Sequence, residues 1–156
     1  MCIRDREGPE HGNGIDPNFM TADFFIDTNV LLYAQSKHPD ETAKRELARE
    51  TLRRPGIAFS SQVLGEFYVN ATRKLSPPIS HDSAVRILRK LEAFPILPIG
   101  PGEVFQALEI RARYSISYWD SLVLAAAQTL KCRAILSEDL NDGQDYGGVQ
   151  VINPFL

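Results

Sequence analysis

Short apolar runs alternate with helix-like segments along most of this chain. Five such runs predict strands, and their ranges are 23–27, 57–60, 96–99, 134–137 and 149–152. Apolar residues spaced three or four positions apart predict helices at 28–35, 40–53 and 118–130, with further helices beginning near Ser61, Ser80 and Pro101. Parallel strands need helical crossovers between them. We therefore predict an α/β domain with three layers, α/β/α, around a mainly parallel central sheet.

The size of the chain suits one soluble domain. A sequence of 156 residues, of which 44% are hydrophobic, can bury one substantial core. No apolar run approaches the roughly 18 residues of a membrane span, and the polar N-terminus lacks the apolar centre of a secretory signal. We expect a cytoplasmic protein that does not associate with membranes.

Residues 1–19 differ from the rest of the sequence. They are rich in glycine, proline and charge, and they show neither a helical nor a strand period. The opening MCIRDR resembles a translated sequencing adapter. We interpret 1–19 as a disordered leader or an artefact of the gene model, and 20–156 as the folded domain, with Met20 as its native start.

Composition argues against several classes of site. The three histidines are scattered, and the two cysteines have neither a disulfide nor a zinc spacing, so a histidine triad and a structural zinc site are both disfavoured. A net charge of −3 argues against coating nucleic acid by bulk attraction, although it leaves room for a local basic patch.

Acidic residues follow two of the predicted strands. Asp27 comes directly after FFI, and the polar segment 137–139 follows AIL. The carboxyl ends of parallel strands meet at one edge of a sheet, where ligands bind. Two more acidic residues, Glu66 and Asp120, stand in otherwise apolar helical segments, SQVLGEFYV and YWDSLVLAAA. Together these positions predict an acidic crevice.

Each acidic residue also has a simpler explanation. Asp27 could cap the helix that follows it, and Asp120 could favour the positive end of its helix dipole. Glu66 could pair with Arg73 or Lys74. These explanations account for the residues singly, but they do not account for all of them lying at strand ends and near helix starts.

Carboxylates gathered in one crevice repel each other unless a cation offsets their charge. Ligand sets made only of oxygen suit Mg²⁺ and Mn²⁺. Such ions bind phosphate oxygens, lower the pKa of a water molecule and stabilise a leaving oxygen, which is nuclease chemistry. The chain offers no convincing Ser–His or Cys–His pair that would indicate a nucleophilic side chain instead.

Four blocks of the sequence resemble PIN-domain ribonucleases, specifically the VapC-type toxins of bacterial toxin–antitoxin pairs. The blocks are FIDTNVLLYA, SSQVLGEF, SYWDSLVLAAA and ILSEDLNDGQDYGGVQVINPF, and the resemblance covers 20–156. It implies an acidic quartet that binds Mg²⁺ or Mn²⁺, made of Asp27, Glu66, Asp120 and Asp139. It also implies that Asn29 and Ser137 orient these carboxylates or a metal-bound water. Homodimerisation, and a cognate antitoxin whose C-terminal segment enters the groove, are further expectations from the resemblance.

Two positions keep alternatives at this point. Glu138, Asp142 and Asp145 compete with Asp139 for the last acidic position; Asp139 is favoured because it occupies the motif's aspartate, and Asp142 is expected to serve a turn. Trp119 is expected to pack in the core, with stacking on a nucleobase as the alternative.

RNA must also be held by its backbone. We expect Arg73, Lys74 and Arg113 to lie nearest the site, against the alternative that they form solvated helix faces. The target is expected to be a single-stranded or looped segment.

The sequence thus predicts a metal-dependent endoribonuclease that acts as a toxin. A water molecule attacks the phosphorus, the 3′ oxygen leaves, and Asp120 or Asp139 helps to deprotonate the water. The alternatives are a PIN nuclease of RNA processing without an antitoxin, and a PIN module that binds RNA or a partner without cutting. An aspartyl-nucleophile phosphatase is disfavoured because Asn29 stands where its second aspartate is needed.

Overall fold

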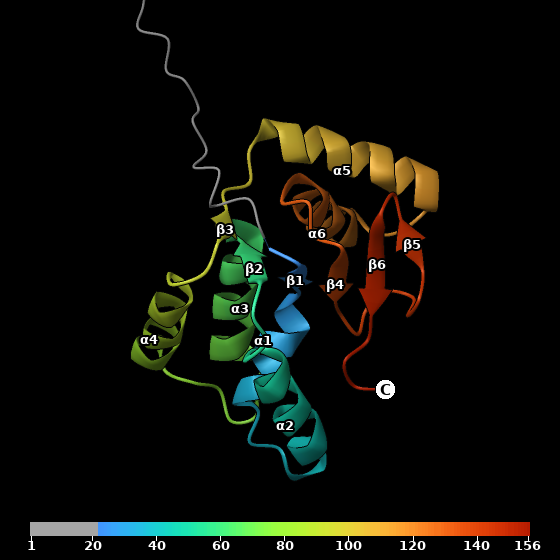
Figure 1. Cartoon of the computed structure of the whole chain (residues 1–156). Helices are drawn as coiled ribbons and strands as arrows, with labels where there is room; N and C mark the ends of the chain where they lie inside the picture. The colour runs from blue at the N-terminus through green and yellow to red at the C-terminus, as the bar shows by residue number, and fades with distance from the viewer. Residues whose placement is uncertain (1–21) are drawn as a thin grey trace, which may run out of the picture.

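The computed structural model of this chain describes residues 22–156 (Figure 1). The interpretation of 1–19 as a leader or artefact, and of Met20 as the native start, falls outside the described residues.

Six strands form one sheet in the order β3-β2-β1-β4-β6-β5. Their bounds are β1 Phe24–Ile26, β2 Ile57–Ser60, β3 Ile96–Leu97, β4 Ala134–Leu136, β5 Asp145–Tyr146 and β6 Val149–Ile152. Every neighbouring pair is parallel except β5 and β6, which are antiparallel. The predicted mainly parallel sheet is confirmed, and five of its strands lie within the predicted ranges.

The strand β5 was not predicted. It turns back onto β6 through Gly147 and Gly148, whose φ angles of 64° and 97° lie in the left-handed region that glycine adopts without strain. A strand of two residues carries too little periodicity to be recognised from sequence.

The helices follow the predicted order. Their bounds are α1 Thr28–Gln35, α2 Thr42–Thr51, α3 Ser61–Arg73, α4 His81–Leu91, α5 Pro101–Tyr114 and α6 Tyr118–Thr129, with a short 3₁₀ turn, η2, at Pro39–Glu41. Ser80 caps α4 as predicted, but Ser60 rather than Ser61 caps α3. Ser60 keeps the extended backbone of β2, and its hydroxyl accepts a hydrogen bond from the Val63 amide.

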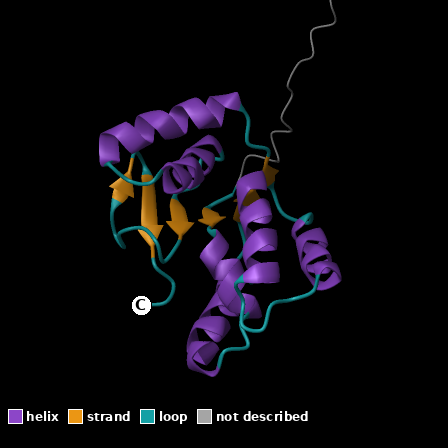
Figure 2. Cartoon of the chain, turned by 180° about the vertical axis from the view of Figure 1, so that it is seen from behind, coloured by secondary structure: helices purple, strands orange, loops and turns teal. Residues whose placement is uncertain are grey.

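The helices form two groups, which are separate in Figure 2. One group is α1 to α4, in which α1 packs on α2 and α3; the other is α5 with α6. The strand order runs from β1 to β2 and β3 on one side, whereas β4 lies on the other side of β1. Because crossovers between parallel strands are right-handed, this reversal places the two helix groups on opposite faces of the sheet. The α/β/α layering is therefore confirmed.

The core lies between the sheet and these helices. Strands β2 and β4 are buried throughout, and α6 is buried from Ser121 to Ala127, as its apolar sequence predicts. None of the described helices is long and apolar enough to cross a membrane. The carboxyl ends of β1 and β4 meet where the strand order reverses, which is the usual ligand-binding edge of such sheets.

Candidate active site

A cavity of about 270 Å³ lies at this edge of the sheet. Segments from four parts of the chain line it: the end of β1 with the start of α1, the first half of α3, the start of α6, and the loop after β4. Its acidic lining residues are Asp27, Glu66, Asp120 and Asp139. The structure therefore brings all four predicted acidic residues to one cavity.

Asp27 is the most buried of the four carboxylates. Its side chain is 5% exposed and caps α1 by accepting a hydrogen bond from the Thr28 amide at 2.7 Å. The Ser137 hydroxyl also donates to it, at 2.6 Å. The pKa of Asp27 is raised to about 7, mainly by burial and also by the negative charges of Asp139 and Glu66, against the lowering effect of the two hydrogen bonds. Asp27 therefore caps α1, but this hydrogen bond does not offset the cost of burying its negative charge.

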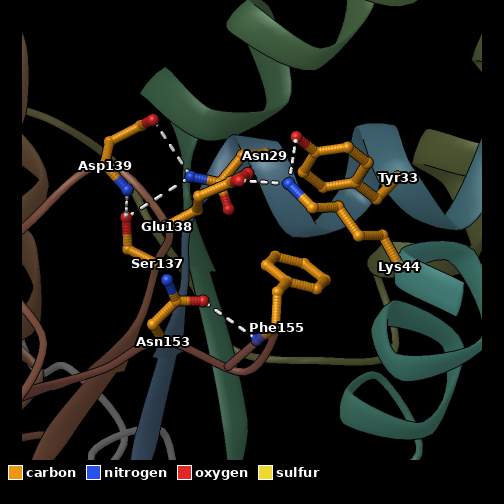
Figure 3. A network of polar contacts seen from close by, with 8 residues as sticks. All are labelled: Asn29, Tyr33, Lys44, Ser137, Glu138, Asp139, Asn153 and Phe155. Atoms are coloured by element: carbon orange, nitrogen blue, oxygen red, sulfur yellow. Dashed lines mark hydrogen bonds and ion pairs between the residues drawn. The ribbon is translucent and has the colours of Figure 1, made fainter. Parts of the chain in front are cut away.

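Asn29 and Ser137 connect Asp27 to Asp139, and Figure 3 shows their contacts with Asp139. The Asn29 amide nitrogen lies 3.0 Å from an oxygen of Asp139, 3.3 Å from the Ser137 hydroxyl and 3.4 Å from an oxygen of Asp27. The Ser137 hydroxyl accepts from the Asp139 amide at 3.1 Å. These contacts place both residues where they orient the two carboxylates. The buried Oδ1 of Asn29 has no hydrogen-bond partner within residues 22–156.

Glu66 and Asp120 face the same cavity from helices on opposite sides of the sheet. Glu66 accepts hydrogen bonds from the Thr28 hydroxyl at 2.8 Å and from the Gln62 amide at 3.1 Å. No ion pair joins Glu66 to Arg73 or Lys74 in the described part of the chain, so that explanation of Glu66 is wrong.

Asp120 is partly buried in the first turn of α6, where its amide donates to the Ser117 hydroxyl at 3.0 Å. Burial raises the pKa of Asp120, and the charges of Asp139 and Glu66 raise it further. Glu66 and Asp139 thus act on both Asp27 and Asp120 as unfavourable neighbours.

The competitors of Asp139 lie elsewhere. Glu138 pairs with Lys44 on α2, and the Lys44 ammonium also donates to the Tyr33 hydroxyl at 3.1 Å (Figure 3). Asp142 lies in a turn with Gly143, as expected, and its side chain accepts from the Asn153 amide at 2.7 Å. Asp145 likewise holds a turn, by accepting from the Gly148 amide at 2.9 Å. None of the three lines the acidic cavity.

The three basic candidates are separated by the fold. Lys74 lines a neighbouring cavity of about 370 Å³, which shares Asn29, Leu32, Asn70 and Asp139 with the acidic one. Arg73 is exposed at the end of α3 and lines neither cavity. Arg113 lines a different cavity, between α5, α6 and the β5–β6 turn, with its guanidinium 5.4 Å from the Tyr114 ring centroid. The structure brings Lys74 close to the site and does not bring Arg113 there.

Trp119 does not pack in the core, so that prediction is wrong. Its side chain is 60% exposed and lines the acidic cavity, with its ring in edge contact with Tyr118 at a centroid distance of 5.1 Å. The buried part of α6 begins only at Ser121. An apolar first turn cannot be distinguished by sequence from the buried turns that follow it.

Sequence reasoning missed three polar residues of the cavity, Thr28, Gln62 and Asn70. Thr28 and Gln62 hold Glu66 through hydrogen bonds. Gln62 stands one helical turn before Glu66, a spacing that puts both side chains on the same side of α3 and signals their contact. Thr28 carries no comparable signal, because its partner comes from a different element.

The donor set suits a hard divalent cation. The four acidic side chains of the cavity offer only carboxylate oxygens, and none of them forms an ion pair with lysine or arginine within residues 22–156. No three acidic, histidine or cysteine side chains of the described residues lie close enough together to coordinate one ion in the present side-chain positions. Asp27, Glu66 and Asp139 instead accept hydrogen bonds from Thr28, Asn29, Gln62 and Ser137. The residues therefore fit such a cation by chemistry, charge and location.

Comparisons with known proteins agree with the geometry. Residues 24–141 match the sequence model of the PIN domain. A comparison with curated protein sequences found no match.

Several solved structures share the fold at low identity. A toxin–antitoxin complex from Klebsiella pneumoniae is 23% identical, with a TM-score of 0.61, and the alignment covers 83% of this chain and 96% of that one. VapC20 of Mycobacterium tuberculosis, described as a toxin that cleaves the sarcin–ricin loop, is 18% identical with a TM-score of 0.58, covering 74% and 91%. DNA-bound VapBC from Salmonella typhimurium is 18% identical with a TM-score of 0.59, covering 83% and 96%.

Proposed function

Because the chain belongs to the PIN-domain family, we propose that it is a metal-dependent endoribonuclease and the toxin of a toxin–antitoxin pair. The observation that carries the proposal is the cavity lined by four carboxylates without a basic partner in the described residues. RNA is supported as the substrate by the similar fold of VapC20, a toxin described as cleaving the sarcin–ricin loop. An antitoxin partner is supported by the similar folds found in toxin–antitoxin complexes.

The four carboxylates of Asp27, Glu66, Asp120 and Asp139 would hold Mg²⁺ or Mn²⁺. A divalent cation there lowers the pKa of a water molecule and offsets the negative charge of the phosphodiester. Asn29 and Ser137 would keep Asp27 and Asp139 oriented, since both already hydrogen-bond to these carboxylates or to the backbone next to them.

Asp120 is the proposed proton acceptor for the attacking water. Its carboxylate lines the cavity from the start of a rigid, buried helix, which would hold it in place for that role. Asp27 is less suited to this role, because its oxygens already accept hydrogen bonds from Thr28 and Ser137. Homodimerisation stays a prediction from the resemblance.

An RNA cleavage assay tests the proposed function. The purified protein, incubated with structured RNA, is expected to cut it with Mg²⁺ or Mn²⁺ and to stop on addition of EDTA. Because the 3′ oxygen leaves, mapping should find 3′-hydroxyl and 5′-phosphate ends. Activity that persists in EDTA, or no cleavage under any of these conditions, would contradict the proposal.

Lys74 and Arg113 offer a matched pair of basic residues for testing how RNA is held. Lys74→Ala is expected to weaken RNA binding on all sequences and to lower the salt dependence by about one released counterion, because Lys74 lines the cavity next to the acidic site. Arg113→Ala is the control, since Arg113 lies beside a different cavity. The measurement is RNA affinity as a function of salt concentration. Equal losses of affinity in the two variants would show that Lys74 is no closer to the bound RNA than Arg113.

A further inference from the structure

Trp119 is an exposed aromatic side chain in a helix that is otherwise buried. Its exposed fraction is 60%, whereas α6 is buried from Ser121 to Ala127. With 60% of its side chain exposed, the planar face of the indole is accessible for stacking. Among the exposed large hydrophobic residues of the described chain, Trp119 is the one that lines the acidic cavity.

The position of Trp119 is fixed relative to the acidic residues. The Gln62 side-chain amide donates to the Trp119 carbonyl at 3.2 Å and to Glu66 at 3.1 Å. The next residue along α6 is Asp120, whose amide is held by the Ser117 cap. The indole ring therefore stands on a backbone that is tied to two of the four carboxylate-bearing residues, and its placement at the cavity needs no ordering of a loop.

The substrate proposed for the acidic cavity determines which chemical group can contact the Trp119 ring. A phosphodiester placed at the carboxylates carries a nucleoside on each side, so the cavity wall lies within reach of an attached base. An unpaired base has a free planar face that stacks on an aromatic side chain, whereas the bases of a duplex already stack on their neighbours. A divalent cation held by the acidic residues would attract the phosphate that accompanies such a base.

We propose that Trp119 stacks against an unpaired nucleobase of the nucleotide next to the cleaved phosphate. This inference rests on the proposed ribonuclease function and adds to it the residue that would recognise the unpaired base of the single-stranded or looped target expected from the sequence. Trp119 then acts as a binding residue that selects unpaired RNA and positions the phosphate.

Fluorescence tests the contact directly, because Trp119 is the single tryptophan of the chain. With Mg²⁺ present and emission recorded before cleavage proceeds, a single-stranded oligoribonucleotide is expected to quench the emission of the full chain, and a duplex of the same sequence is expected to quench it much less. A blue shift that grows with protein concentration in the absence of RNA would instead mean that a second copy covers the ring, and would overturn the inference.

Kinetics with base-deleted RNA supply the second readout. Trp119→Ala is expected to raise the KM for single-stranded RNA roughly 5- to 100-fold with little change in kcat, and Trp119→Tyr, which keeps a stacking face, should recover most of the loss. Removing the base next to the cut should cost the wild type a similar factor and cost Trp119→Ala almost nothing, because both changes delete one contact. Phe105→Ala is the control, since Phe105 is 67% exposed but lies on α5 and does not line the cavity.

The outcomes separate this inference from the proposed function. If the wild type cleaves RNA, but Trp119→Ala keeps its KM and emission is not quenched, the inference is wrong and the ribonuclease stands. If the base deletion and Trp119→Ala give independent, additive losses, the inference is also wrong. A wild type that neither cleaves RNA nor shows quenching overturns both.

Discussion

Replacing Asp27 with asparagine is expected to abolish Mg²⁺- or Mn²⁺-dependent RNA cleavage while the protein stays folded. Asparagine has nearly the same shape and keeps an oxygen that can cap α1 through the Thr28 amide. It removes the negative charge of the most buried carboxylate in the cavity. Metal assistance contributes several kcal/mol to such reactions, so the rate should fall roughly 10³-fold.

Asp142→Asn provides the matched control for this measurement. It makes the same chemical change three residues beyond Asp139, but Asp142 holds the Asn153 amide and does not line the cavity. The measurement is the initial cleavage rate of the wild type and the two variants at saturating Mg²⁺. Circular dichroism checks that all three proteins are folded. Cleavage by Asp27→Asn within a few-fold of the wild type would show that the reaction does not depend on this carboxylate.

A second large effect is expected on stability in the absence of divalent cations. Burial raises the folded-state pKa of Asp27 from 3.8 to about 7. Below pH 3.8 Asp27 is protonated in both states, between these values only the folded state keeps the proton, and above pH 7 the buried charge is fully unfavourable. The free energy of unfolding contributed by Asp27 therefore falls as pH rises through this window. At 1.36 kcal/mol per pKa unit, the loss between pH 5 and pH 8 is roughly 3 kcal/mol.

Urea unfolding in EDTA at pH 5 and pH 8 measures this effect. Asp27→Asn cannot ionise, so it should gain roughly 3 kcal/mol relative to the wild type between the two pH values. Adding Mg²⁺ at pH 8 should stabilise the wild type and leave the variant unchanged, because a ligand stabilises only the state that binds it. Parallel pH dependences for the two proteins would mean that Asp27 is not the buried, uncompensated charge that the structure indicates.

The sheet could be predicted from sequence because its central strands are buried apolar runs bounded by polar residues. Phe24–Ile26 and Ala134–Leu136 show this pattern plainly, and the helices between the strands require a parallel arrangement. The strand at Asp145–Tyr146 was missed because its pairing depends on a two-glycine turn and on β6, and not on a pattern of its own.

The acidic site was predictable in its residues but less so in its surroundings. An acidic residue inside or directly after an apolar segment is unexpected for a purely structural role, and this made the four carboxylates recognisable. All four line one cavity. Which way a helix turns its side chains depends on tertiary packing, so sequence could not show that Arg113 faces a different cavity or that Trp119 faces the acidic one. Thr28 was missed for the same reason.

Diffraction from crystals grown with Mn²⁺ tests the central claim most directly. The account predicts an anomalous peak inside the cavity, with carboxylate oxygens of Asp27 and Asp139 at direct ligand distance and Glu66 and Asp120 turned toward the ion. A cavity without such a peak at saturating Mn²⁺, with Asp27 still bonded to Ser137 and Asp139 still bonded to Asn29, would contradict it.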